Sequence, residues 1–243
     1  MSAGTPDDAH ERPSGRDPSE KQVLVWDLPA RVSHWGFACS LTASLYIGFQ
    51  CDPEGPLFKH HMLAGLLAAW FLLVRVILGF VGARAMRWRA FIHGPRAVLR
   101  YLAGAFRGRQ MEYPGLNPGS ALFAQLLYTG LALLIATGFA GEWVETWHGR
   151  IAWGAVGLIG VHLLGLALHA LRHRRATPLA MVHGWDVRTT DAGVASPNRI
   201  AGWILLLLGI AVAWLLVRCF DETTSVLSIP GLPEVAFPVM QKG

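Results

Sequence analysis

Five apolar segments, each long enough to cross a lipid bilayer as a helix, constrain this chain more than any other feature of its sequence. A hydrocarbon layer about 30 Å thick needs about 20 helical residues, with roughly 17 as the lower end. Five such helices in 243 residues could not all be buried without lipid. The sequence therefore predicts an all-α, integral membrane helical bundle. The segments are residues 32–50, 61–82, 121–140, 148–171 and 200–220.

The composition agrees with a membrane protein, although the first segment is less apolar than the others. Hydrophobic residues make up 53% of the chain and charged residues 15%, whereas soluble domains are about 25% charged. This balance excludes a disordered chain, a disulfide-rich mini-domain and a free cytosolic enzyme. The first segment is the least certain, because polar side chains interrupt it: Ser33, His34, Ser40, Thr42 and Ser44.

The loops differ in charge, and this difference predicts the orientation. Arginines gather after the second and fourth segments, whereas the other two loops carry acidic residues. Because short loops rich in Lys and Arg stay in the cytoplasm, we expect a cytoplasmic N-terminus and a periplasmic C-terminus. The arginines are Arg84, Arg87, Arg89, Arg96, Arg100, Arg107 and Arg109 in the first loop, and Arg172, Arg174, Arg175, Arg188 and Arg199 in the second.

The chain divides into four parts by composition. Residues 1–22 form a disordered cytoplasmic tail without the apolar stretch of a signal peptide. Residues 23–185 form a four-helix core, residues 186–220 a linker with the fifth helix, and residues 221–243 an extracytoplasmic tail. Within the core, residues 95–106 predict a short basic helix with proline in its first turn. This helix lies either along the anionic inner leaflet or in water as a solvated basic loop.

Histidines inside the spans are the candidate functional residues, since an ionisable group in the hydrocarbon region is costly unless it is paired or bound to a metal. His148 and His162 are fourteen residues apart, so in a helix they lie within ~40° of each other and ~21 Å apart in depth. His34 opens the first span on the inner side, and His61 opens the second on the outer side. Depth therefore pairs His34 with His162 and His61 with His148.

Two histidines at each depth point to a bound metal. A single membrane histidine is more often a helix–helix hydrogen bond or a proton relay, but four at matched depths favour ligation. Zinc prefers four protein ligands, or three with an open position, whereas two imidazoles fit the axial positions of a haem. The cysteines form no C-x-x-C-H motif, so such a haem is held by coordination and not by thioether bonds. The cysteines are Cys39, Cys51 and Cys219.

Three other side chains have open interpretations. His60 adjoins His61 and could replace it as a ligand, and geometry alone does not decide between them. His169 shares a face with His162 but falls at the membrane interface. Arg75 lies fourteen residues after His61, near the inner level. It either binds a haem propionate through bidentate hydrogen bonds or extends its charged head to the cytoplasmic interface.

Several motifs resemble the bacterial cytochrome b561 family, which includes the b-type cytochrome subunits of nickel–iron hydrogenases. Residues 25–35, VWDLPARVSHW, are similar to the start of that family's first helix. The spacing of His148 and His162 is the most specific match, and the resemblance covers roughly residues 25–185. The remaining matches are residues 61–65, 75–82, 93–102 and 178–184.

The resemblance implies a bundle that binds two haem b groups and moves electrons between the quinone pool and a redox partner. The family's ligands fall on His34, His61, His148 and His162, and Gly65, four residues after His61, favours that residue over His60. Two positions depart from the family pattern. Leu116 replaces a histidine that many members carry before the third helix, and Gly149 replaces an acidic residue after a ligand.

These observations predict a di-haem cytochrome b of the bacterial inner membrane. Electrons would pass between quinone and an extracytoplasmic redox protein, such as a cytochrome c or a dehydrogenase subunit, and no nucleic-acid partner is expected. One alternative is an oxidoreductase that passes electrons from a small species such as superoxide to quinone, but the outer loops are acidic. Another is a haem-free transporter, but the chain shows no internal repeat. No acid–base pair or nucleophile arrangement predicts catalytic residues, and the C-terminal tail either docks a partner or is structureless.

Overall fold

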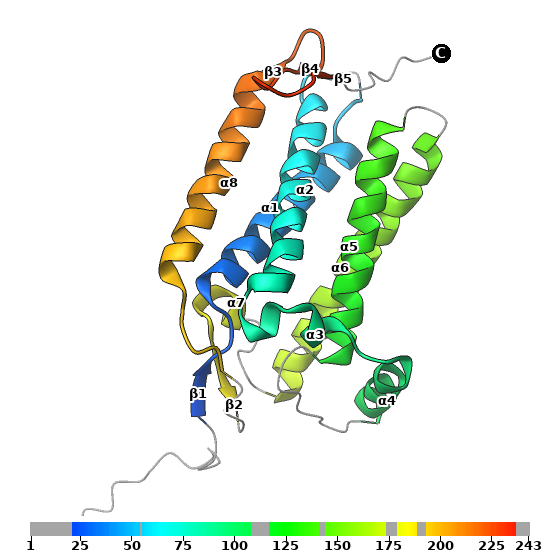
Figure 1. The fold of residues 1–243 in the computed structure, drawn as a ribbon. Helices are drawn as coiled ribbons and strands as arrows, with labels where there is room; N and C mark the ends of the chain where they lie inside the picture. Colours follow the sequence, from blue (N-terminus) through cyan, green and yellow to red (C-terminus); the bar gives the residue numbers. More distant parts are fainter. Residues whose placement is uncertain are drawn as a thin grey trace, which may run out of the picture.

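Five long helices, joined by short elements, form a bundle in the computed structural model, which describes residues 21–53, 55–107, 117–140, 144–173, 179–188 and 193–236 (Figure 1). The long helices are α1 (Leu28–Gln50), α2 (Lys59–Val81), α5 (Pro118–Phe139), α6 (Glu145–His173) and α8 (Arg199–Cys219). The short helices are η1 (Arg84–Met86), α3 (Trp88–Phe91), α4 (Pro95–Phe106) and α7 (Ala180–His183). The predicted all-α membrane bundle is confirmed.

Four of the helices, α2, α5, α6 and α8, are each long and apolar enough to cross a membrane. The helix α1 has the length of a span, at 23 residues, but it carries polar side chains within the bundle. Its serines satisfy their hydroxyl groups on the preceding turn: Ser33 Oγ donates to the Ala30 carbonyl at 3.0 Å, and Ser40 Oγ to the Gly36 carbonyl at 2.7 Å. Because neighbouring helices cover α1, it needs a less apolar surface than the helices around it.

The main hydrophobic core joins α1, α2, α5 and α6. Apolar side chains of these four helices form one buried cluster, and α8 packs outside it against α1 and α2. Gly36 allows α1 to approach the ring of Phe71 on α2 so closely that a side chain at this position would collide with the ring. The buried cluster consists of Phe37, Leu41, Leu45, Ala68, Phe71, Leu127, Leu131, Leu134, Ala152 and Ala155.

Two small sheets lie at opposite ends of the bundle (Figure 1). Strands β1 (Lys21–Leu24) and β2 (Trp185–Arg188) pair antiparallel where α1 begins. Strands β3 (Phe220–Asp221), β4 (Val226–Leu227) and β5 (Val235–Ala236) form the second sheet, where α8 ends. Leu227 of this sheet packs against Leu63 and Leu216.

These sheets contain residues from both predicted tails. Lys21 and Gln22 belong to β1 instead of the N-terminal tail, and residues 221–236 return over the bundle instead of forming a structureless end. Residues 1–20 and 237–243 lie outside the described residues. The sequence did not predict these strands because their pairing depends on segments that are far apart or very short.

The predicted helix at residues 95–106 is confirmed as α4. Arg96 and Arg100 are exposed on it, and so is Leu99, at 67% of its surface. The ring of Tyr101 contacts Gly119 and thereby fixes α4 against the start of α5. A basic and apolar exposed surface suits the boundary between lipid and water, and the contact with the inner leaflet stays a prediction.

Candidate functional site

His61 and His148 meet at the end of the bundle where α2 and α6 begin. Their ring centres are 6.0 Å apart and their planes cross at 77°. His61 also stacks on Phe58, with ring centres 5.3 Å apart. The structure thus brings together the two histidines that the sequence pairs by depth on the outer side.

The side of His61 that faces away from His148 is hydrogen-bonded to α1. Its Nδ1 lies 2.8 Å from the backbone oxygen of Ser44. A carbonyl oxygen only accepts hydrogen bonds, so Nδ1 carries the proton and Nε2 keeps its lone pair. In return, Ser44 Oγ donates to the His61 carbonyl at 3.1 Å. Two reciprocal bonds therefore hold both the backbone and the ring of His61.

His148 is held in the same manner by α5. Its Nδ1 lies 3.0 Å from Thr137 Oγ1, which itself lies 2.7 Å from the Leu133 carbonyl oxygen. The threonine hydroxyl donates to that carbonyl, so its oxygen accepts the Nδ1 proton of His148. Both imidazoles are thus in the tautomer that leaves Nε2 available to a metal, and the partner of the other nitrogen fixes each ring.

The outer pair has the spacing that a shared metal ion requires. Imidazole–metal bonds are about 2 Å long, so two rings on opposite sides of one ion have centres about 6 Å apart, close to the distance found here. Glycines stand beside both rings. A Cβ atom on Gly48 would lie 2.9 Å from His61 Nδ1, and one on Gly138 would lie 3.6 Å from His148 Cε1. His61 and His148 would therefore be able to hold one metal ion, such as a haem iron, between them.

The other two predicted ligands lie toward the opposite end of the bundle. His34, on α1, is close enough to His162 and Arg75 to interact electrostatically with both. The ring of His162 stacks on Phe123 of α5, with centres 4.3 Å apart and planes 10° apart. The ring of His34 meets Trp35 edge-on at 5.5 Å. The structure thus places His34 near His162 and Arg75, and His61 against His148, while their roles as ligands stay a prediction.

Arg75 is held inside the bundle by three other elements. Its Nε donates to the Tyr128 hydroxyl on α5 at 2.8 Å, and its Nη1 lies 2.9 Å from Met86 Sδ. The guanidinium carbon lies 5.9 Å from the ring centre of Phe91. These contacts, together with the proximity to His34, favour a role within the bundle over extension of the charged head to the interface.

The adjacent residues His60 and His61 have different surroundings in the structure. His61 faces His148, whereas the Nδ1 of His60 is buried and has no hydrogen-bond partner among the described residues. The side chain of His169 and residues 115–116, which include Leu116, lie outside what the structure describes.

Sequence reasoning missed the residues that orient the histidines. Ser44 counted only as a polar interruption of the first span, and Thr137, Gly48 and Tyr128 were not singled out. The sequence did contain a signal for two of these residues. Ser44 and Gly48 are four residues apart in the first span, so they lie on one face of its helix.

The profile of the family described as prokaryotic cytochrome b561 matches residues 25–184, which contain both histidine groups and Arg75. The chain belongs to the prokaryotic cytochrome b561 family. A protein described as a probable Ni/Fe-hydrogenase B-type cytochrome subunit, from Bradyrhizobium diazoefficiens, is 24% identical over 239 residues, which cover 76% of this chain and 92% of the relative. No solved structure matches the chain.

Membership of the cytochrome b561 family establishes the general activity. The chain is a multi-pass bacterial membrane cytochrome of the b type that transfers electrons, and haem b is its cofactor. The facing imidazoles of His61 and His148 are consistent with that cofactor.

Proposed function

We propose that this cytochrome b561 binds two haem b groups and carries electrons across the membrane between the quinone pool and an extracytoplasmic redox protein. The observation that carries the proposal is the placement of two histidines of α6, fourteen residues apart, each with a histidine of another helix within interaction range. A single helix thereby contributes a ligand near each face of the bundle.

Each haem supplies a reversible one-electron change at its iron. His61 and His148 hold the outer haem, and His34 and His162 hold the inner one. The chain contributes by positioning the haem ligands and by setting their surroundings. Ser44 and Thr137 fix the ligand rings, and the apolar core around them lowers the local dielectric, which together with nearby charge sets the potentials.

Arg75 belongs to the inner site in this proposal and binds a haem propionate. Replacing it by leucine is expected to lower the midpoint potential of the inner haem, because a nearby positive charge favours the reduced iron. The expected shift is about 70 mV, since a charge about 10 Å away is worth about 1.7 kcal/mol at an effective dielectric constant of about 20, and about 1.4 kcal/mol equals about 59 mV for one electron. A potentiometric titration followed at the haem absorption bands measures it.

The charge-conserving variant Arg75→Lys is the matched control and should keep most of the wild-type potential. Equal potentials in the wild type and in Arg75→Leu, with haem still bound, would contradict a role for this charge at the inner haem. A shift confined to the outer haem would contradict the assignment of Arg75 to the inner site.

The proposed orientation rests on the arginine-rich loops, which place the N-terminus in the cytoplasm and the β3–β4–β5 sheet in the periplasm. The partner is proposed to be a dehydrogenase-type subunit or a cytochrome c, and the description of the Bradyrhizobium relative as a hydrogenase cytochrome subunit supports the first of these.

Two measurements test the proposal. Anaerobic stopped-flow mixing with a quinol should reduce both haems of the purified protein. In liposomes with ferricyanide trapped inside, dithionite added outside should bleach the ferricyanide through the wild type, whereas His162→Ala should reduce the rate at least tenfold because the inner haem is missing. Haems that superoxide reduces but quinol does not would overturn the quinone assignment.

A further inference from the structure

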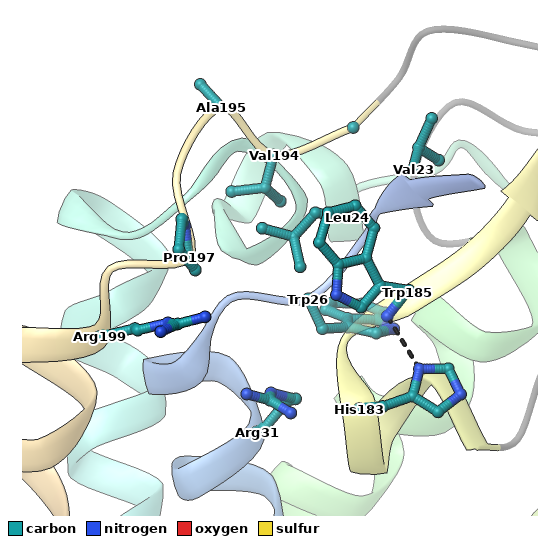
Figure 2. A pocket seen from close by; sticks show the side chains of 11 residues that line it. Val23, Leu24, Trp26, Arg31, His183, Trp185, Val194, Ala195, Pro197 and Arg199 are labelled. Atoms are coloured by element: carbon teal, nitrogen blue, oxygen red, sulfur yellow. Dashed lines mark hydrogen bonds between the residues drawn. The ribbon is translucent and has the colours of Figure 1, made fainter. Parts of the chain in front are cut away.

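A pocket of about 450 Å³ lies where the N-terminal segment meets the start of α8 (Figure 2). Two contacts hold its walls together. Asn198 Nδ2 donates to Asp27 Oδ2 at 2.8 Å, and the Leu28 amide donates to the Pro197 carbonyl at 3.0 Å. The pocket is therefore a feature of the junction between α1 and α8, and none of the four histidines proposed as ligands lines it.

Two arginines line this pocket. Figure 2 shows Arg31, from the first turn of α1, and Arg199, the first residue of α8, on the same side of the pocket. Arg31 Nη1 donates to the Val182 carbonyl, but its Nε is buried and has no hydrogen-bond partner in the described part of the chain. That buried atom is closed to a ligand, but both guanidinium groups line the pocket and carry a permanent charge, so an anion there would be favoured.

Among the described residues, no carboxylate lines the pocket to neutralise the arginines. The nearby Asp27 is buried, and its two carboxylate oxygens accept hydrogen bonds from the Ala30 amide and from Asn198. The electrostatic preference of the pocket is therefore for a negatively charged ligand.

The surroundings of the pocket suit a lipid better than a free ion. Trp26 and Trp185 line its other side (Figure 2), and tryptophans favour the headgroup level of a bilayer. Directly after Arg199, α8 exposes Ile200 at 79% and Trp203 at 59%. An anion with acyl chains could thus place its charge in the pocket and its chains along α8.

We propose that this pocket binds the phosphate group of an anionic phospholipid, held by Arg31 and Arg199. Basic pockets between helices at a membrane face recognise such headgroups, and guanidinium groups match phosphate oxygens in charge and geometry. The bound lipid would bridge the first turns of α1 and α8, and this site does not depend on the number of haems.

The test compares phospholipid binding to the wild type and to the double variant Arg31→Gln/Arg199→Gln. Both proteins are purified in mild detergent, and phosphatidylglycerol or phosphatidylcholine is titrated in while native mass spectrometry counts the bound lipid. The wild type should prefer phosphatidylglycerol. Each arginine should contribute about fivefold to that affinity, so the double variant should lose about 25-fold.

Arg218→Gln is the matched control, since Arg218 is exposed at the opposite end of α8 and its loss should leave lipid binding unchanged. Haem content reports whether each variant is folded. If the double variant does not fold, Arg199→Gln alone, at an exposed position, should lose about fivefold.

Three results would overturn the assignment. Equal binding of phosphatidylglycerol and phosphatidylcholine, or unchanged binding by a folded double variant, would show that the two arginines do not form the lipid-binding site. Displacement by millimolar inorganic phosphate without any retained phospholipid would assign the pocket to free phosphate. Recovery of a quinone that the wild type retains and the double variant loses would assign the pocket to quinone.

Discussion

Replacing His148 by alanine is expected to remove about one haem per chain and to leave the other in place. The variant leaves His61 without the ring that it faces at 6.0 Å, and one imidazole cannot supply both axial ligands of a haem iron. His162→Ala should remove the other haem, because His162 lies on the same helix but belongs to the His34 group. Haem per chain is measured by the pyridine haemochrome method, and the loss of different spectral components should distinguish the two variants.

His60→Ala is the matched control for this experiment, and His61→Ala is its counterpart. The adjacent histidines differ in geometry, since His61 faces His148 while the buried Nδ1 of His60 has no partner in the described structure. We expect His61→Ala to match His148→Ala and His60→Ala to retain both haems. Loss of the outer haem from His60→Ala, with full retention of that haem in His61→Ala, would show that His60 is the ligand and His61 is not. The haem that remains in each variant shows that the bundle has folded.

Replacing Gly48 by leucine is expected to reduce outer haem occupancy at least tenfold although no ligand is changed. A Cβ atom at this position would lie 2.9 Å from both Cε1 and Nδ1 of His61, closer than carbon and nitrogen atoms pack. The ring would have to move and would lose its hydrogen bond to the Ser44 carbonyl. Loss of the groups that orient a metal-binding histidine typically costs 10- to 100-fold in affinity. Haem titration into protein expressed under haem limitation measures the affinity.

Gly130→Leu is the matched control, because it adds the same side chain to α5 at a position where nothing lies within 4 Å of a Cβ atom in the described structure. Gly130→Leu should retain both haems. The inner haem should remain in Gly48→Leu as well, since His34 lies fourteen residues before Gly48 on α1. Full outer haem occupancy in Gly48→Leu would show that the ring of His61 is not confined by α1.

The helices could be predicted from local sequence, because apolar length and composition decide whether a segment crosses lipid. The predicted segments agree with α1, α2, α5, α6 and α8 to within four residues at each end, and α4 agrees at both ends. The lower hydrophobicity of the first span could also be predicted, because its serines are read directly from the sequence. The small sheets could not be predicted from local sequence, because β1 pairs with a strand more than 150 residues away.

The sequence by itself determined that the long helices form a membrane bundle, and it predicted four histidines at two depths, because helical rise and rotation convert spacing into position. Helix geometry alone could not decide between His60 and His61, since successive residues on a helix point in directions about 100° apart and only the packing of α2 sets its rotation. Tertiary structure turned His61 toward His148, placed the Ser44 carbonyl and the Thr137 hydroxyl beside these two rings, and enclosed Arg75 beside Tyr128. These contacts join residues of different helices, so they exist only once the helices have packed.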